Sequence, residues 1–273
     1  MSGAPQQSRR SMMTPGAALI TGGAKRLGRA MALALAADGW NVAISYLEAE
    51  SEAEATLAEI RATGRKGAAL RADLTAEAET EKLIDEAAAA LGAPLTCLVN
   101  NASIFEFDDL TGMSRAGWDR ALESNLRAPV RLSQLFAAQA PPPGRDQAGE
   151  PLASAVIVNM IDQRVLKPTP MFMSYSIAKM GLWAFTRMAA QALAPQIRVM
   201  GIGPGPTLRG VRQSAPHFAA QRAATLLGRG AGPDDIVATL RFILASPALT
   251  GQMIAVDGGQ HLGWKTPDVL GVE

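Results

Sequence analysis

Residues 17–28 read Ala-Ala-Leu-Ile-Thr-Gly-Gly-Ala-Lys-Arg-Leu-Gly, a short apolar run followed by a glycine turn. The apolar run predicts a buried β-strand, and the residues rich in Ala and Leu at 26–37 predict a helix directly after the turn. A glycine turn between a strand and a helix lets the backbone approach a pyrophosphate, which then lies at the helix N-terminus. The segment therefore predicts the first strand, turn and helix of a dinucleotide-binding fold.

Strand-like and helix-like segments alternate along the rest of the chain. Further strands are predicted at 41–46, 66–71, 95–99, 155–160, 197–202 and 253–256, and helices at 51–62, 76–91, 114–138, 174–194 and 234–245. Such alternation predicts parallel strands joined by crossover helices, and the nearly continuous apolar character of the strands indicates a sheet covered on both faces. The predicted fold is α/β, with a single Rossmann-like, doubly wound parallel sheet of about seven strands and helices on both faces.

The alternation has no break that would mark a second domain. Residues 141–151 (PPPGRDQAGEP) are predicted to form a loop, and the irregular stretch 204–232 is interpreted as a flap over a site. Residues 1–15 are polar and lack the apolar core of a signal peptide, so they are predicted to form a flexible tail. A single dinucleotide-binding catalytic domain is then expected over residues 16–273.

Composition excludes several classes of protein. With 26 basic and 25 acidic residues the net charge is +1, which predicts no basic face for nucleic acid, and no apolar run is long enough for a membrane span. Cys97 is the only cysteine, so no internal disulfide is possible, and a reducing, cytoplasmic location is expected. The thiol lies in an apolar run and is interpreted as a core residue. His217 and His261 lack metal-ligand spacing, so no metal site is expected.

Two basic residues, Lys25 and Arg26, lie where the dipole of the predicted first helix disfavours cations. An anion at that position would explain them. The second predicted strand ends at Ser45-Tyr46 without the acid that holds the ribose 2′-hydroxyl in NAD-selective folds, which favours NADP(H), with Arg26 on the 2′-phosphate. Glu48 follows closely and leaves NAD as an alternative.

Tyr175 and Lys179 are four residues apart and share one face of a predicted helix. An ammonium near a phenol favours the phenolate, so the pKa of Tyr175 is expected to fall below its usual value of about 10. Such a tyrosine gives a proton to a carbonyl or imine near neutral pH. The pair therefore predicts a reductase.

On these residues the chain resembles the short-chain dehydrogenase/reductase family, from about Ala17 to Gly263. The matching pieces are the 21–28 turn, Asp73-Leu74, Asn100-Asn101-Ala102, Asn125, the Tyr175/Lys179 pair, Pro204-Gly205 and the run Val256-Asp257-Gly258-Gly259. The resemblance implies a dinucleotide cofactor and usually a homotetramer. It makes Tyr175 the general acid, Lys179 the residue that holds the nicotinamide ribose, Asn125 the residue that orders a relay water, and Asp73 an adenine contact.

The implied cofactor-binding residues are drawn from the ends of several predicted strands. They are Gly22, Lys25, Arg26, Leu27, Ser45, Tyr46, Asp73, Leu74, Asn101, Ala102, Ser103, Tyr175, Lys179, Pro204 and Gly205.

Two departures from the common family pattern resemble its pteridine reductase branch. Arg26 replaces a glycine of the turn, and Asp162 replaces the catalytic serine thirteen positions before Tyr175. The run Asn101-Ala102-Ser103-Ile104-Phe105 agrees with that branch, in which the serine bonds the pterin and the phenylalanine stacks on its ring. The resemblance thus implies a substrate site made of Ser103, Phe105, Asp162 and Tyr175.

The carboxyl group at position 162 differs from a serine hydroxyl in the hydrogen bonds that it can form with a substrate. A serine hydroxyl donates to a substrate carbonyl, whereas an ionised Asp162 only accepts, so it suits a substrate with N–H groups or a proton relay through Tyr175. The expected reaction is NADPH-dependent hydride transfer to a dihydropterin, with Tyr175, Lys179, Asp162 and Asn125 as the catalytic residues. The alternatives are a short-chain carbonyl or 3-oxoacyl reductase and a non-catalytic NADP-binding regulatory protein.

The sequence leaves two possible roles open for each of two further residues. Arg209 either meets a polar edge of the substrate or is solvated, and Trp264 either closes the pocket or lies at a subunit contact.

Overall fold

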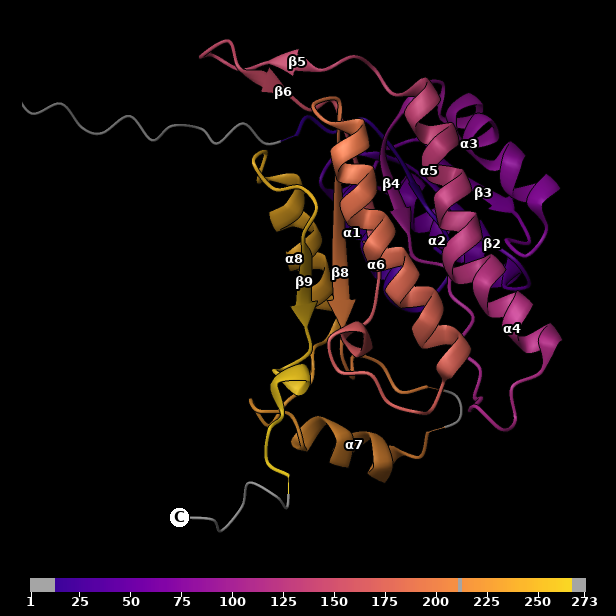
Figure 1. Cartoon of the computed structure of the whole chain (residues 1–273). Coiled ribbons are helices and arrows are strands. Elements are labelled where there is room, and N and C mark those ends of the chain that lie inside the picture. The colour runs from indigo at the N-terminus through magenta and orange to yellow at the C-terminus, as the bar shows by residue number, and fades with distance from the viewer. Residues whose placement is uncertain (1–12, 211–212, 267–273) are drawn as a thin grey trace, which may run out of the picture.

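The computed structural model describes residues 13–210 and 213–266. The predicted doubly wound sheet is confirmed: seven parallel strands lie in the order β3-β2-β1-β4-β7-β8-β9 (Figure 1). They are β1 (Ala17–Ile20), β2 (Asn41–Tyr46), β3 (Gly67–Arg71), β4 (Leu95–Asn100), β7 (Ala155–Met160), β8 (Ile197–Pro204) and β9 (Met253–Val256). The central strands are almost wholly buried, which explains their continuous apolar runs.

Helices cover both faces of the sheet. One core layer joins the sheet to α1 (Arg26–Ala37), α2 (Glu50–Ala62) and α8 (Pro233–Leu244). The other joins it to α3 (Glu77–Leu91), α5 (Ala128–Gln139) and α6 (Met173–Leu193). The predicted long helix at 114–138 is α4 (Arg115–Leu122) and α5, joined without a break by a π-helical turn, η1 (Glu123–Arg127). Short 3-10 turns, η2 (Gln163–Val165) and η3 (Gln260–Leu262), follow β7 and β9.

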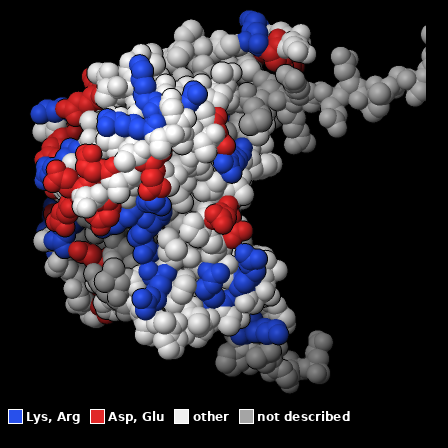
Figure 2. Space-filling view, turned by 180° about the vertical axis from the view of Figure 1, so that it is seen from behind, with Lys and Arg blue, Asp and Glu red and all other residues white. Residues whose placement is uncertain are grey.

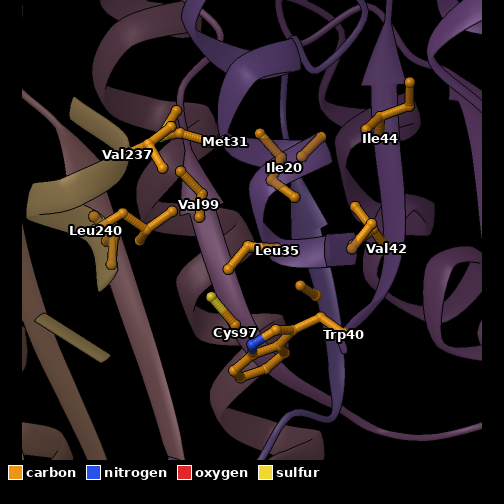
Figure 3. Packing of buried hydrophobic residues seen from close by; sticks show 14 of the residues in the cluster. Ile20, Met31, Leu35, Trp40, Val42, Ile44, Cys97, Val99, Val237 and Leu240 are labelled. Atoms are coloured by element: carbon orange, nitrogen blue, oxygen red, sulfur yellow. The ribbon is translucent and has the colours of Figure 1, made fainter. Parts of the chain in front are cut away.

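Figure 3 shows the first core layer, in which side chains of α1 and α8 meet those of β1, β2 and β4. Cys97 is fully buried there, and burial raises the pKa of its thiol to about 12. Its interpretation as an unreactive core residue is confirmed.

The strand order reverses beside β1, whose neighbours are β2 and β4. In doubly wound sheets, ligands bind outside the carboxyl ends of the strands at such a switch point. The glycine turn follows β1 and the Asn100-Asn101-Ala102 run follows β4, so the fold brings these two predicted motifs to one edge.

Two stretches predicted as irregular contain regular structure. The loop at 141–151 forms most of a small antiparallel ribbon of β5 (Gly144–Arg145) and β6 (Pro151–Leu152). The stretch at 204–232 includes α7 (Ala215–Ala223), which begins where the Ser214 hydroxyl accepts from the His217 N–H. No residue of α7 is buried. Its sequence therefore lacks the helical spacing of apolar residues from which a helix can be predicted.

The predicted flexible tail falls mostly on residues 1–12, which lie outside the described residues. Met13 itself packs against the first core layer, and its N–H donates to the Leu244 carbonyl at 3.4 Å.

A buried cation closes the carboxyl end of α8. Arg198 is 6% exposed, and its Nη1 donates to the carbonyls of Ile243, Ser246 and Leu249 at 3.0, 3.1 and 3.2 Å. Its positive charge also faces the negative end of the helix dipole.

We expect Arg198→Met to lower the free energy of unfolding by about 2–4 kcal/mol, because three carbonyls lose their shared charged donor. Urea unfolding followed by circular dichroism measures the change, and Arg187→Met, which removes an exposed arginine from α6, is the matched control. Equal midpoints for the two variants would contradict this role.

Candidate active site

The glycine turn after β1 has the shape of a backbone cradle. Gly22 has φ +62°, and a Cβ at Gly28 would overlap the carbonyl of Gly22. Arg26 has φ +57°, a left-handed conformation that non-glycine residues rarely adopt. The position at which the resemblance places a glycine is therefore one whose backbone favours glycine.

Neighbouring strands brace this cradle. The Ser45 Oγ accepts from the Gly22 N–H at 3.3 Å, and the Asn101 Nδ2 donates to the Thr21 carbonyl at 2.8 Å. The Ala102 N–H donates to the Thr21 hydroxyl at 3.0 Å. Ser45, Asn101 and Ala102, all predicted cofactor residues, thus shape the turn from β2 and β4.

The beginning of α1 suits an anion. Its N-cap residue, Lys25, makes no side-chain cap and its first turn has no acid, so the first N–H groups of the helix are not used by a capping side chain. These features, together with the glycine backbone, fit the pyrophosphate of a dinucleotide.

The side chain of Arg26 crosses to the loop after β8. Its Nη1 donates to the Arg209 carbonyl at 3.0 Å and its Nη2 donates to the Leu208 carbonyl at 3.2 Å. Arg26 thereby links the turn to the predicted flap, a contact between residues distant in sequence. Its bond to a 2′-phosphate stays a prediction.

The remaining predicted cofactor residues lie at the same edge of the sheet or support it. The Asp73 Oδ1 accepts from the Thr75 N–H at 2.8 Å, and Leu74 is buried in the second core layer. Pro204 ends β8, and Gly205 lies so close to Asp257 that a Cβ would overlap it. Leu27 and Tyr46 are half-buried, whereas the side chains of Glu48, Arg209 and Trp264 are exposed.

The predicted catalytic residues meet at the amino end of α6. The Tyr175 hydroxyl donates to the Asp162 Oδ2 at 2.8 Å, and the Lys179 Nζ donates to the Met160 carbonyl at 2.8 Å. Asp162 follows β7 and caps η2, where its Oδ1 accepts from the Arg164 N–H. The structure thus brings Tyr175, Lys179 and Asp162 together, as expected.

Asn125 lies in the π-helical turn and is fully buried. Its Nδ2 donates to the carbonyls of Ile104 and Ala121, both at 2.9 Å, and its Oδ1 accepts from the Ser103 hydroxyl at 2.7 Å. A π turn widens a helix locally and often marks a functional site. Here Asn125 fixes the loop that carries Ser103 and Phe105.

The expected fall in the pKa of Tyr175 is wrong. Burial raises this pKa well above its usual value, and the neighbouring Asp162 raises it further. The Lys179 Nζ is directed to a carbonyl and lies 5.6 Å from the Tyr175 ring centroid. Burial also lowers the pKa of Lys179 to about 8 and raises that of Asp162. Tyr175 is therefore a protonated donor at neutral pH.

Aromatic rings gather above Tyr175. The ring of Phe105 stacks on Phe172 with 4.2 Å between centroids and a 7° interplanar angle, and it meets Tyr175 edge-on at 4.7 Å. Phe172 has φ +57°, and its N–H donates to the Asp108 carbonyl at 2.8 Å. The Asp108 carboxylate also accepts from the Ser174 N–H and hydroxyl. Asp108 thus ties the Phe105 loop to the helix that carries Tyr175.

The sequence prediction missed Phe172, Asp108 and Arg164. Phe172 lies three residues before Tyr175, one helical turn away, and Arg164 follows Asp162 by two positions. Their short distance in sequence from Tyr175 and Asp162 could have marked Phe172 and Arg164 as site residues. Asp108 reaches the site through a contact between residues distant in sequence, so no local pattern marks it.

Within residues 13–210 and 213–266, no group of three or more His, Cys, Asp or Glu side chains is arranged to hold a metal ion. None of the helices in these ranges is long and apolar enough to cross a bilayer.

The chain matches the family described as enoyl-(acyl carrier protein) reductase over residues 22–261. It is 32% identical over 256 residues to a short-chain dehydrogenase/reductase of Armillaria gallica, covering 89% of this chain and 94% of that protein. It is 30% identical over 250 residues to the 3-oxoacyl-[acyl-carrier-protein] reductase FabG of Staphylococcus aureus, and the match covers 90% of this chain and 98% of that protein.

Two solved structures resemble it still more in sequence. FolM alternative dihydrofolate reductase 1 of Brucella canis, complexed with NADP, has a TM-score of 0.87 and 38% identity over 94% of this chain and 98% of that one. The FolM alternative dihydrofolate reductase 1 of Brucella suis, also in complex with NADP, has a TM-score of 0.86 and 39% sequence identity. The match covers 94% of this chain and 100% of that one. These matches and the geometry of the site agree, and the chain therefore belongs to the short-chain dehydrogenase/reductase family of NAD(P)-dependent oxidoreductases.

Proposed function

We propose that this protein is an NADPH-dependent reductase of a dihydropterin. The observation that carries the proposal is the hydrogen bond from the Tyr175 hydroxyl to the buried Asp162 carboxylate, at 2.8 Å, beside the ring of Phe105. The similarity to two FolM proteins supports it, because both are named alternative dihydrofolate reductase 1 and both were solved with NADP.

Each of the site residues has a separate role in the proposed reaction. NADPH, when bound, supplies a hydride to the carbon of the ring C=N bond. The phenol of Tyr175, whose pKa is raised by burial, gives its proton to the ring nitrogen. Asp162 holds the phenol in place and accepts from ring N–H groups, and Phe105 offers the aromatic face on which the ring stacks. Lys179 is expected to hold the nicotinamide ribose, and Ser103 a polar edge of the pterin.

The central test replaces Asp162 by the serine that is usual in the family. We expect Asp162→Ser to lower kcat/KM for 7,8-dihydrobiopterin by about 10²-fold, because a charged carboxylate that accepts through two oxygens is replaced by one shorter, uncharged hydroxyl. Initial rates with NADPH and with NADH measure this, on the dihydropterin, a simple ketone and a 3-oxoacyl thioester. Asp162→Asn, which keeps one acceptor oxygen, should lose less.

The wild type should reduce the dihydropterin faster than the ketone, and should prefer NADPH. Pterin turnover equal to or below ketone turnover would refute the proposal.

A second candidate function is reduction of a 3-oxoacyl thioester or another carbonyl. The 30% identity to FabG over 98% of its length favours it. It predicts carbonyl reduction that survives Asp162→Ser. The non-catalytic alternative, cofactor binding with regulation, predicts no turnover of any substrate; the intact Tyr175, Lys179 and Asn125 argue against it.

We also propose that the enzyme is a cytoplasmic homotetramer. The outer face of α6 exposes apolar side chains at Ile177 and Met188, 41% and 67% exposed, which a partner subunit would cover. The lone buried Cys97 suits a reducing compartment. Light scattering of the purified protein tests the assembly, and a monomer would contradict it.

A further inference from the structure

The backbone of Arg26 favours glycine, so the side chain at this position needs an explanation. Arg26 has φ +57°, a left-handed conformation that costs energy for most residues with a Cβ and that glycine adopts freely. Among residues 13–210 and 213–266, the hydrogen-bond acceptors of its guanidinium are two carbonyls only, those of Leu208 at 3.2 Å and Arg209 at 3.0 Å. The contact with the loop after β8 is therefore what an arginine adds to this turn.

This contact spans the edge of the sheet at which doubly wound folds bind their ligands. Arg26 follows β1, whereas Leu208 and Arg209 follow β8, and β4 and β7 lie between these two strands. Neighbouring strands are roughly 4.8 Å apart, so the loop crosses about 14 Å of the sheet edge before it meets Arg26. Asn101 follows β4 and Asp162 follows β7, so the loop passes the ends of the strands that carry the site.

The same loop is fastened where it leaves β8. We call residues 205–210 the bridging loop. The Nη1 of Arg222, on α7, donates to the carbonyls of Pro206 at 2.7 Å and Ala231 at 2.6 Å. One arginine therefore holds the start of the bridging loop, and Arg26 holds its later part against the glycine turn.

Both ends of the bridging loop belong to the expected cofactor site. Gly22, Lys25 and Arg26 lie in the glycine turn after β1, and Pro204 and Gly205 lie at the end of β8. A dinucleotide that contacts both places is enclosed when the loop is held against the turn. It then leaves the site only when the loop moves away.

Positive charge at this end of the molecule also attracts an anionic cofactor. Seen from behind, Lys and Arg outnumber Asp and Glu at the lower end, the end that holds α7 (Figure 2). The charge of Arg26 and its contact with the bridging loop are therefore two separate effects. Lysine at this position distinguishes them, because it keeps the charge but lacks the planar fork that donates to two carbonyls at once.

We propose that Arg26 is a positioning residue for the bridging loop, and that its two hydrogen bonds to this loop retain NADP(H) in the site. Cofactor release then requires that these hydrogen bonds break. The inference rests on NADP(H) binding and on no particular substrate, so it is independent of the proposed dihydropterin reduction.

The first measurement is the rate at which excess NADP⁺ displaces bound NADPH, followed by NADPH fluorescence in stopped flow. We expect Arg26→Gly to speed release about tenfold to a hundredfold, because two charged hydrogen bonds to the bridging loop are lost. Glycine suits the backbone of the turn, so the variant should fold. Arg26→Lys should speed release about threefold to tenfold. Arg29→Gln removes another arginine of α1, which pairs with Glu59, and should release NADPH like the wild type.

Trypsin cleavage of the cofactor-free protein tests the bridging loop without turnover. The bond between Arg209 and Gly210 lies in this loop, and the side chain of Arg209 is exposed. Cleavage at this bond, followed by mass spectrometry, should be about tenfold faster in Arg26→Gly, because proteolysis follows the population of the opened loop. Arg29→Gln should be cleaved there at the wild-type rate.

Two results would overturn the proposal. One is wild-type cleavage at Arg209 in Arg26→Gly, since the side chain would then not hold the loop. The other is faster NADPH release in Arg26→Gly with wild-type release in Arg26→Lys, which would assign a charge effect alone to Arg26. A protein that meets both expectations and reduces no dihydropterin would keep the role of Arg26 and refute the proposed reaction.

Discussion

Tyr175→Phe is expected to lower kcat for the proposed dihydropterin reduction by about 10²–10⁴-fold, the range for loss of a general acid. The phenol is the only side-chain donor that forms a hydrogen bond with Asp162 within the described part of the chain. Phenylalanine keeps the ring that packs edge-on against Phe105, so the aromatic site should keep its shape. NADPH affinity should change far less than kcat, because Tyr175 is only one of the expected cofactor-binding residues and the glycine cradle does not involve its hydroxyl.

Single-turnover rates at saturating NADPH, together with fluorescence titration of NADPH, measure the two quantities separately. Thr239→Val is the matched control: it also removes one hydroxyl, which donates to the Asp235 carbonyl within α8, and its kcat should equal that of the wild type. A Tyr175→Phe enzyme that kept more than about a tenth of wild-type kcat would show that another group gives the proton.

The sheet could be predicted from sequence because a parallel strand covered on both faces must be apolar throughout. The strands at 155–160 and 253–256 were predicted with the bounds that the structure has. Elements that bury little side-chain surface escaped detection: α7 buries no residue, and the two-residue strands β5 and β6 lie on exposed backbone. The periodic spacing of apolar residues in a sequence shows which face of a helix or strand is buried. It therefore cannot reveal elements that bury no face.

The identity of the catalytic residues was predictable, but their electrostatics were not. The four-residue spacing of Tyr175 and Lys179 places both on one face of α6. It does not say where the ammonium points, and the Met160 carbonyl that receives it belongs to β7. The burial that raises the pKa of Tyr175 arises from segments distant in sequence. Likewise, no local pattern could show that Asp108 fastens the Phe105 loop to α6, or that Arg26 reaches the loop after β8.

Lys179→Met is expected to abolish most activity and, in the protein without cofactor, to change how stability depends on pH. Lys179 is 2% exposed, and burial lowers the pKa of its ammonium from 10.5 to about 8. Below pH 8 the ammonium is charged in both the folded and unfolded states, and the folded state bears the cost of burying it. Between pH 8 and 10.5 the unfolded state binds more protons, so this group's cost to stability declines as pH rises.

The stability of Lys179→Met relative to the wild type should therefore be greatest near pH 6.5. It should fall by about 2 kcal/mol by pH 9.5, since each unit of pKa shift corresponds to about 1.4 kcal/mol. Urea unfolding at several pH values measures this difference. Lys82→Met on the exposed face of α3 is the matched control, because solvent surrounds its ammonium in both states. A pH-independent difference for Lys179→Met would mean that the ammonium loses no solvation on folding, which its burial beside Tyr175 and Asp162 contradicts. The expected decline of the difference between pH 6.5 and 9.5 would instead show that the site holds a buried ammonium at a cost in stability, which its role in the reaction offsets.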